Sequence, residues 1–351
     1  MPESIIKYRR YIILASIVLT VLAGLMLPRL EVNPNLDDYV PDRLENKGYL
    51  RELNSIFGSS EMILVMLHTG DVLNATTLDR LRVLSEDLYQ VEGISDCVSP
   101  FDAKEISYED GFMLMEALFE EASPEPIDYK SLKSRIENNP MASRFFSEDF
   151  SLVSLVLTKS LDTPDTVIDE NRAVIDGHPG EEEVFIGGLP YIRYSISGNI
   201  KSDMMVLVPL ALILMVGMLY FFFREWKGVY MPFLVVSMSI VIAFGVMAIL
   251  GWQISLISIL MPIMLIAIAN DYGIHLISRY QELAKSEEPM SMIEMSKQIY
   301  VDLKRPIIIT GLTTIAGVLG LLTHTMIPAA QLGVLTSIGI AMALILSIWF
   351  L

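Results

Sequence analysis

Six long apolar stretches constrain this 351-residue chain more than any other feature of its sequence. A helix needs roughly 20 predominantly apolar residues to cross the hydrocarbon core of a bilayer. The stretches are approximately Tyr11–Leu27, Met204–Phe223, Val229–Leu250, Ile254–Ile277, Ile307–Leu322 and Leu332–Leu351. Apolar residues make up 52 % of the chain and charged residues 19 %, which is more apolar surface than a soluble core of this size can bury. The sequence therefore predicts an α-helical polytopic membrane protein with six transmembrane helices.

A long block of ordinary soluble composition separates the first apolar stretch from the second. We therefore expect the chain to have three parts. Residues 1–27 form a cytoplasmic N-terminus with the first span, residues 28–203 form a separately folded domain, and residues 204–351 form the other five spans. A polar connection at residues 278–306 alternates apolar and charged residues from Ser291 onward, which predicts an amphipathic helix on the cytoplasmic surface.

Charge is divided sharply between these parts. Residues 28–203 hold 15 basic and 34 acidic residues, a local net charge of −19, while the rest of the chain has a net charge of +2. The short loops Gly251–Gln253 and Thr323–Gln331 have no Lys or Arg, whereas the N-terminus and the alternate loops have ten. Because basic loops stay in the cytoplasm, we expect a cell-membrane protein with a cytoplasmic N-terminus and with residues 28–203 external or periplasmic.

The first apolar stretch has the basic start and apolar middle of a secretory signal peptide. However, Leu25–Arg29 lacks the small-x-small pattern of a cleavage site. We expect the stretch to be retained as a membrane anchor. The overall net charge of −17 argues against nucleic acid as a partner, because binding phosphates requires clustered Lys and Arg.

The order of elements in residues 28–203 indicates an α+β fold. The pattern predicts β-α-β, an acidic helical insertion near Ser107–Phe146, and a second β-α-β. This is the order of the split βαβ, ferredoxin-like plan. The predicted strands are Glu61–His68, Ile94–Val98, Ser151–Lys159 and Val184–Ile186, and the predicted helices run from Asn74 or Thr76 to Val91 and from Thr163 to Ile175.

Asp271 is the only carboxylate well inside any of the six apolar stretches. A charged Asp in mid-bilayer costs on the order of 2.5–3.5 kcal/mol, so such a residue tends to stay protonated or to face a polar seam. Tyr272 can hydrogen-bond the acid, and His275, four residues on, shares its helical face. These three residues are candidates for a proton relay. The alternatives are that Asp271 is a structural polar contact or lies near the headgroups, and that His275 is interfacial.

A polar helix seam is predicted beside this acid. Asn270 precedes Asp271, and the fifth span contributes three hydroxyl residues, Thr310, Thr313 and Thr314, together with small glycines. Small and hydroxyl residues also allow helices to pack closely in lipid, so packing alone is the competing explanation for the threonines. The sharper interpretation is a hydrated seam that faces Asp271.

Enzyme and cofactor chemistry has little support in the sequence. The chain has one cysteine and four scattered histidines, and it lacks a Walker loop, a His-x-x-x-His pair and a Gly-x-Ser-x-Gly motif. We expect no metal, no cofactor and no catalytic residues. Since no ATPase module is present, any transport must use an ion gradient or a partner.

The plan of one span, a large external domain and five clustered spans resembles a half-repeat of the resistance–nodulation–division (RND) superfamily, and most closely its MMPL-like hydrophobe-exporter branch. The matching motifs are NPNLDDYVP at Asn33–Pro41, FGSSEMILVML at Phe57–Leu67, VFIGGLP at Val184–Pro190 and ANDYGIHLISRYQEL at Ala269–Leu283. The last is fairly specific, while the others are weak alone. A related sterol-sensing arrangement covers the second to sixth spans in eukaryotic relatives.

The resemblance implies proton-driven export of hydrophobic or amphiphilic, lipid-like molecules. It also implies that Asp271 accepts the proton, that Tyr272 is its partner, and that the external domain captures substrate. The family usually has two six-span halves, so we expect this sequence to be an N-terminal half or to pair as a homo-oligomer. The alternatives are a membrane sensor or assembly partner that does not transport, whose outer domain binds lipid or protein, and a protein-secretion helper.

Overall fold

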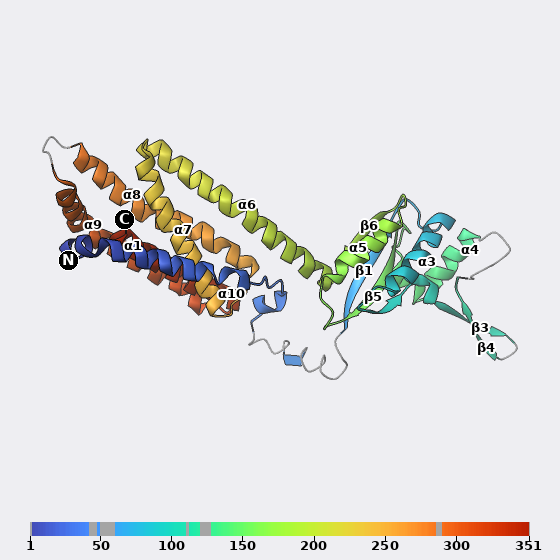
Figure 1. Ribbon diagram of the computed structural model, residues 1–351. Helices are drawn as coiled ribbons and strands as arrows, with labels where there is room; N and C mark the ends of the chain where they lie inside the picture. Colours follow the sequence, from blue (N-terminus) through green and yellow to red (C-terminus); the bar gives the residue numbers. More distant parts are fainter. Residues whose placement is uncertain are drawn as a thin grey trace. The chain divides into compact units, whose positions relative to one another are not determined.

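A computed structural model of the protein describes residues 2–41, 48–49, 60–109, 112–119, 128–285 and 290–350. It divides into two compact units (Figure 1). The helical unit comprises Met1–Leu44 and Ile196–Leu351, and the α/β unit comprises Glu45–Ser195. The helix α6 is continuous across the boundary between them.

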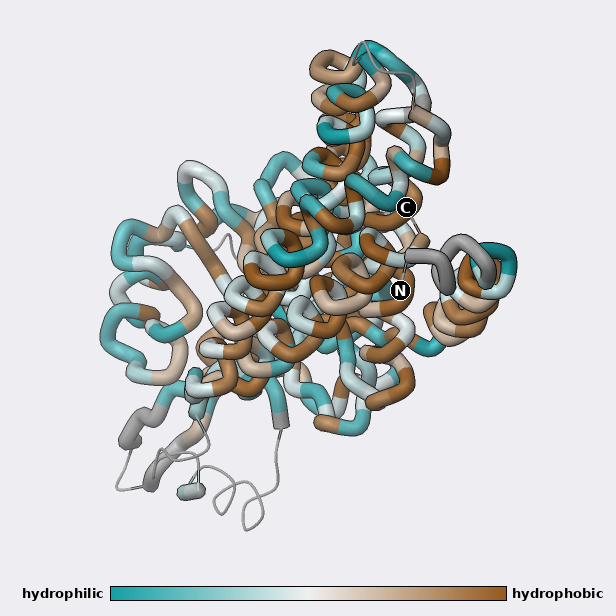
Figure 2. Tube along the Cα trace, turned by 90° about the vertical axis from the view of Figure 1, so that its left-hand side faces the viewer, coloured by the Kyte–Doolittle hydropathy of each residue, from teal (hydrophilic) through white to brown (hydrophobic). Residues whose placement is uncertain are grey.

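The helical unit contains six helices, among the described residues, that are long and apolar enough to cross a membrane. Figure 2 shows these helices mainly in the colours of hydrophobic residues. The prediction of six apolar helices is therefore confirmed. The helices are α1 (Pro2–Gly24), α6 (Leu189–Phe223), α7 (Trp226–Ile249), α8 (Leu260–Ala284), α9 (Met292–Leu319) and α10 (Ile327–Trp349), with 3-10 turns η1 (Leu27–Arg29), η2 (Leu36–Tyr39), η5 (Leu256–Ile259) and η6 (Gly320–Thr323).

Two helices are longer than the apolar stretches that predicted them. The second begins at Leu189 rather than near Met204, because the polar segment before Met204 is helical as well and α6 continues through Gly198 and Pro209. The predicted connection at residues 278–306 is largely helical: it forms the last turns of α8 and the first turns of α9, which continues without a break through Pro306. Residues 286–289 of that connection lie outside the described residues.

Small residues set the distances between the helices of this unit. A Cβ placed on Gly245 of α7 would lie 2.7 Å from the Cα of Ala23 in α1, and one on Gly273 of α8 would lie 2.6 Å from the Cβ of Pro232 in α7. Close backbone approach at small residues is how helices gain packing energy in lipid, where the hydrophobic effect between helices is absent. These contacts hold α7 between α1 and α8.

The α/β unit is built on a four-stranded antiparallel sheet in the order β2-β5-β1-β6. Strand β1 lies between β5 and β6, so each β-α-β half leaves a gap that a strand of the other half fills. This is the split βαβ arrangement that the sequence predicts. The elements are β1 (Ser60–His68), α3 (Ala75–Tyr89), β2 (Ile94–Val98), η3 (Pro100–Asp102), β3 (Lys104–Glu109), β4 (Phe112–Ala117), α4 (Tyr129–Asn138), η4 (Ala142–Phe145), β5 (Leu152–Ser160), α5 (Val167–Gly177) and β6 (Glu183–Gly187).

Alternation along the strands separates a buried face of the sheet from an open one. Every second residue of β5 from Val153 to Lys159 is buried, and α3 adds the leucines at positions 78, 81, 84 and 88 to the same core. Asn74 caps α3 by accepting a 2.8 Å hydrogen bond from the backbone N–H of Thr77. On the other face, Met62 is 60 % exposed and Phe185 is 48 % exposed.

The insertion between the two β-α-β halves differs from the predicted helical segment. Its first part is a hairpin in which β3 pairs with β4, and only its later part forms a helix, α4. The sequence Glu105–Glu109 alternates polar with apolar residues, which is the period of a strand, and the local acidic charge hid this alternation. Residues 110–111 and 120–127 of the insertion, and Phe57–Ser59 of the second family motif, lie outside the described residues.

Candidate functional site: an acid and a histidine on α8

Asp271 lies near the middle of α8, as the twelfth of its 25 residues. The helix follows η5, where the hydroxyls of Ser255 and Ser258 lie 2.9 Å apart and form a capping box. Pro262 stands in the first turn, where a helix tolerates proline because that N–H would have no partner within the helix. The helix therefore runs without a break through the acid.

Asp271 and His275 form a pair on one face of α8. The Oδ1 atom of Asp271 lies 3.5 Å from the Nε2 atom of His275, and the side chains are 51 % and 59 % exposed. The i,i+4 spacing brings both groups to one side of the helix, as the sequence predicts. No other described helix covers this face. Among the described residues, His275 is therefore the ionisable side chain that contacts Asp271.

Tyr272 points to a different side of α8 from Asp271. Its side chain is 1 % exposed and belongs to the core of the helical unit. A Cβ on Gly311 of α9 would lie 3.2 Å from the Tyr272 hydroxyl and 2.9 Å from Leu344 of α10, so the glycine makes room for the phenol ring. In the described part of the chain, the Tyr272 hydroxyl has no hydrogen-bond partner, and no hydrogen bond joins it to Asp271.

The predicted polar seam is divided between two environments. The amide oxygen of Asn270 is buried and has no hydrogen-bond partner among the described residues. On α9, the hydroxyls of Thr313 and Thr314 donate to carbonyls of their own helix, at 3.0 Å to Ile309 and 2.8 Å to Thr310. Thr310 and Thr313 are exposed. Hydroxyl bonding within the helix is typical of threonine packed in a span, and a seam facing Asp271 stays a prediction.

Arg279, which the family motif includes, fixes the end of α8 to α9. Its guanidinium lies 2.8 Å from Asp302 of α9 and 2.6 Å from Glu282, one turn further along α8. In the sequence, Arg279 stands out only as a member of the motif at Ala269–Leu283. Its partner Asp302 was missed because it lies 23 residues away, and the sequence did not predict how the segment between them folds back.

Sequence reasoning also missed a buried ion cluster in the α/β unit. Lys159, at the end of β5, is 1 % exposed and lies 3.2 Å from Glu61 and 3.1 Å from Asp165. Arg193 donates two hydrogen bonds to each of the same carboxylates. The available signal was the alternation of β5, which puts Lys159 on the same face of the strand as the buried Val153, Leu155 and Leu157.

The cluster keeps both carboxyl groups ionised. Hydrogen bonds from Arg193, and then from Lys159, hold the pKa of Glu61 below its ordinary value of 4.5 despite its burial. Burial raises the pKa of Asp165, but the hydrogen bonds and charges of the same two cations more than offset it, so the net pKa is lowered. Each carboxylate stabilises the fold while it is charged.

Replacing Glu61 with glutamine should therefore destabilise the α/β unit by about 3 kcal/mol at neutral pH, because it leaves buried cations underpaired. Since the folded-state pKa of Glu61 is lowered, the difference from the wild type is complete above about pH 4.5 and shrinks as the pH falls through the folded-state pKa. Urea unfolding across this pH range measures it. The control Glu105→Gln removes a pair whose side chains are 41 % and 36 % exposed, and should cost less than about 1 kcal/mol.

The described residues contain no group of three or more His, Cys, Asp or Glu side chains that could hold a metal ion. Six apolar helices together with a ferredoxin-like α/β unit define a multi-pass membrane protein. Comparison with known families agrees with this class. Residues 50–351 match the MMPL family, and the chain belongs to that family, a branch of the RND superfamily of transporters.

A curated relative extends the comparison to most of the chain. A protein of Methanocaldococcus jannaschii, described as a membrane protein, is 21 % identical over 355 aligned residues, which cover 95 % of this chain and 86 % of the relative. MMPL proteins are transporters and generally not enzymes.

Proposed function

We propose that this chain is part of a secondary transporter that uses the proton-motive force to export hydrophobic or amphiphilic, lipid-like molecules. The observation that carries the proposal is the Asp271–His275 pair near the middle of α8, directly after the apolar first half of that helix. Insertion of a charged Asp into a membrane costs on the order of 2.5–3.5 kcal/mol, so an acid within a span is rare unless it has a function. Reversible protonation of Asp271, assisted by His275, would couple proton entry to helix movement.

The open face of α8 supports a second half as partner. Two ionisable side chains that are half exposed on a membrane helix are unfavourable against acyl chains, and a facing helix with polar residues would remove that cost. We propose that this face packs against a second six-helix half, supplied either by further sequence or by another copy of the chain. Tyr272 would then act from inside the helical unit, through its packing against Gly311, rather than by bonding the acid directly.

The proposed orientation puts the α/β unit outside the membrane, because all the basic loops lie on the opposite side. In that position the unit would take up the substrate from the outer leaflet. The helix α6 runs from Leu189, next to the sheet, to Phe223 in the helical unit, and would connect substrate capture to the spans.

The second candidate function is a membrane sensor or assembly partner without transport. It is favoured by the open face of the sheet, where Met62 and Phe185 are exposed, because such a surface suits a lipid or a protein. This function requires the sheet face and does not require Asp271.

A gradient experiment separates the two functions. The protein is reconstituted into proteoliposomes loaded with a fluorescent amphiphile, and amphiphile movement is measured with and without an imposed pH gradient. Transport should depend on the gradient and stop when a protonophore collapses it. Movement that is equally fast without a gradient, or no movement although the amphiphile binds, would contradict proton-driven export and favour the sensor.

A further inference from the structure

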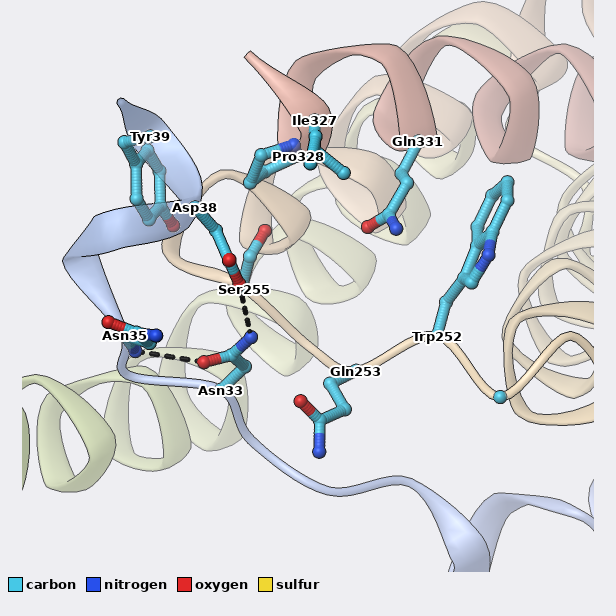
Figure 3. Close-up of a pocket in the computed structure, with 11 residues that line it drawn as sticks. Asn33, Asn35, Asp38, Tyr39, Trp252, Gln253, Ser255, Ile327, Pro328 and Gln331 are labelled. Carbon is cyan, nitrogen blue, oxygen red and sulfur yellow. Dashed lines mark hydrogen bonds between the residues drawn. The ribbon is translucent and has the colours of Figure 1, made fainter. Parts of the chain in front are cut away.

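A polar cavity lies at one end of the helical unit, and neither Asp271 nor His275 lines it. It has a volume of about 140 Å³, several times the ~10–15 Å³ that a single water molecule needs. Three segments line it: the turn that follows α1, the connection between α7 and α8, and the first turns of α10 (Figure 3). The lining residues are Asn33, Asn35, Asp38, Tyr39, Gly251, Trp252, Gln253, Ser255, Ile327, Pro328 and Gln331.

Hydrogen bonds between these segments hold the walls of the cavity in place. The backbone N–H of Asn33 donates to the carbonyl of Ile254 at 2.8 Å, and the N–H of Ile254 donates to the carbonyl of Glu31 at 2.8 Å. The N–H of Leu256 donates to the hydroxyl of Tyr39, also at 2.8 Å. The turn after α1 is therefore fixed against the connection between α7 and α8, so the walls of the cavity are in place before a ligand binds.

The lining favours an uncharged, polar ligand. It contains four side-chain amides, one carboxylate and no Lys, Arg or His, so it offers nothing to neutralise a phosphate or a carboxylate. Amides both donate and accept hydrogen bonds, as hydroxyl groups do. The one carboxylate, Asp38, already accepts a 2.7 Å hydrogen bond from the Asn33 amide, and a metal ion would need more charged ligands than this.

Several of these groups keep hydrogen-bonding capacity for a ligand. The side chain of Gln331 has no hydrogen-bond partner within the described ranges, and Figure 3 shows it beside Trp252, across the cavity from Asn33 and Asp38. The Tyr39 hydroxyl accepts from Leu256, which leaves its own hydrogen to donate. The indole ring of Trp252 and the ring of Pro328 add apolar surface, which suits the C–H faces of a sugar ring.

Apolar side chains adjoin the segments that line the cavity. Ile327, in its wall, is 46 % exposed, and Ile249 and Leu322, close to the lining segments in sequence, are 68 % and 51 % exposed. Ile249 ends α7 and Ile327 begins α10, so the cavity lies at the ends of candidate membrane spans, where a bilayer has its headgroups. A ligand with a polar head and an apolar tail matches both surfaces.

We propose that this cavity binds an uncharged polyhydroxyl group, a sugar or a polyol, carried as the headgroup of an amphiphile. Asn33, Asp38 and Gln331 hydrogen-bond the hydroxyl groups, Trp252 covers the ring, and the tail lies along the exposed apolar residues. Binding here requires neither a proton gradient nor Asp271, so the inference stands or falls separately from proton-driven transport.

The test uses the full chain in phosphatidylcholine nanodiscs with Trp226→Phe and Trp349→Phe, which leave Trp252 as the sole tryptophan. Its fluorescence is titrated with three eight-carbon amphiphiles below their micelle concentrations: octyl glucoside, octyl phosphocholine and octyltrimethylammonium. Octyl glucoside should produce a saturable change and the other two should not. Free glucose, titrated separately, tells whether the sugar suffices without a tail: saturation by glucose supports the polyhydroxyl site but assigns it to soluble ligands.

Two variants locate the binding. Gln331→Met keeps the side-chain volume but removes its hydrogen bonds, and should weaken octyl glucoside binding about threefold to tenfold. The control Gln298→Met, on α9 outside the cavity, should leave binding unchanged. Asp38→Asn should weaken binding only by a similar factor, because the amide oxygen can still accept from Asn33. The proposal is overturned if octyltrimethylammonium saturates and Asp38→Asn abolishes that response, if all three amphiphiles act equally, or if octyl glucoside has no effect.

Discussion

Replacing Asp271 with asparagine should abolish proton-gradient-dependent transport while leaving the protein folded and inserted. Asparagine has nearly the same shape but cannot bind and release a proton, so the Asp271–His275 pair loses its titratable acid. Insertion should not suffer, because neutralising an Asp in the membrane removes a cost on the order of 2.5–3.5 kcal/mol. The expected loss of rate is on the order of 100-fold, the scale seen when a proton-transferring group is removed from an enzyme.

The measurement compares gradient-driven amphiphile transport in proteoliposomes of equal protein content. Glu282→Gln is the matched control, because it neutralises a carboxylate on the same helix whose side chain is 68 % exposed and which contacts Arg279 at the end of α8. That variant should keep most of the activity. His275→Gln should slow transport less than Asp271→Asn, since histidine assists the acid. Unchanged transport in Asp271→Asn would falsify the proton-relay role and leave Asp271 as a structural polar contact.

The membrane architecture was predictable because it depends on local composition. Twenty apolar residues in a row have few stable outcomes other than a span, and the alternation of β5 or the Asn74 cap of α3 is written within a few residues of sequence. The helix bounds were less accurate, as at Leu189, because polar residues continue a helix when nothing breaks it.

The surroundings of the candidate residues could not be derived in the same way. Helical spacing placed His275 on the face of Asp271, and the structure gives their separation as 3.5 Å. Helical spacing could not show that Tyr272 packs against Gly311, which is 39 positions away in the sequence. The Lys159 cluster and the cavity around Gln331 likewise join residues from separate segments, and only tertiary packing brings such residues together.

The glycine pair Gly187-Gly188, between β6 and α6, is the site of the second large effect. Gly188 has a φ of +101°, a conformation that residues with a side chain rarely adopt, and a Cβ there would lie 2.2 Å from the carbonyl oxygen of Met62 in β1. That oxygen belongs to the backbone of a central strand and cannot move without breaking the sheet. Gly188→Ala should therefore destabilise the α/β unit by about 3 kcal/mol or more.

Gly187→Ala is the matched control, because the two positions are adjacent and differ in both respects. Its φ is not positive, and the nearest atom to an added Cβ is the terminal methyl of Met66 at 3.5 Å, an ordinary contact. Its effect should lie within about 0.5 kcal/mol. The contrast isolates the conformation and close approach at Gly188 from any general sensitivity of the turn.

Cys97, the single cysteine of the chain, provides the measurement. It lies in β2, and burial, with smaller contributions from Asp102 and Asp96, raises the pKa of its thiol to about 11. The folded protein therefore reacts slowly with a maleimide at neutral pH, whereas unfolding exposes the thiol and returns its pKa to about 9.0. Pulse labelling in increasing urea should show the midpoint for Gly188→Ala lowered by more than about 1 M relative to Gly187→Ala, since unfolding energies fall by about 1–3 kcal/mol per molar urea. Equal midpoints for the two variants would mean that the sheet tolerates a side chain at Gly188 and that the close approach to Met62 does not limit the stability of the α/β unit.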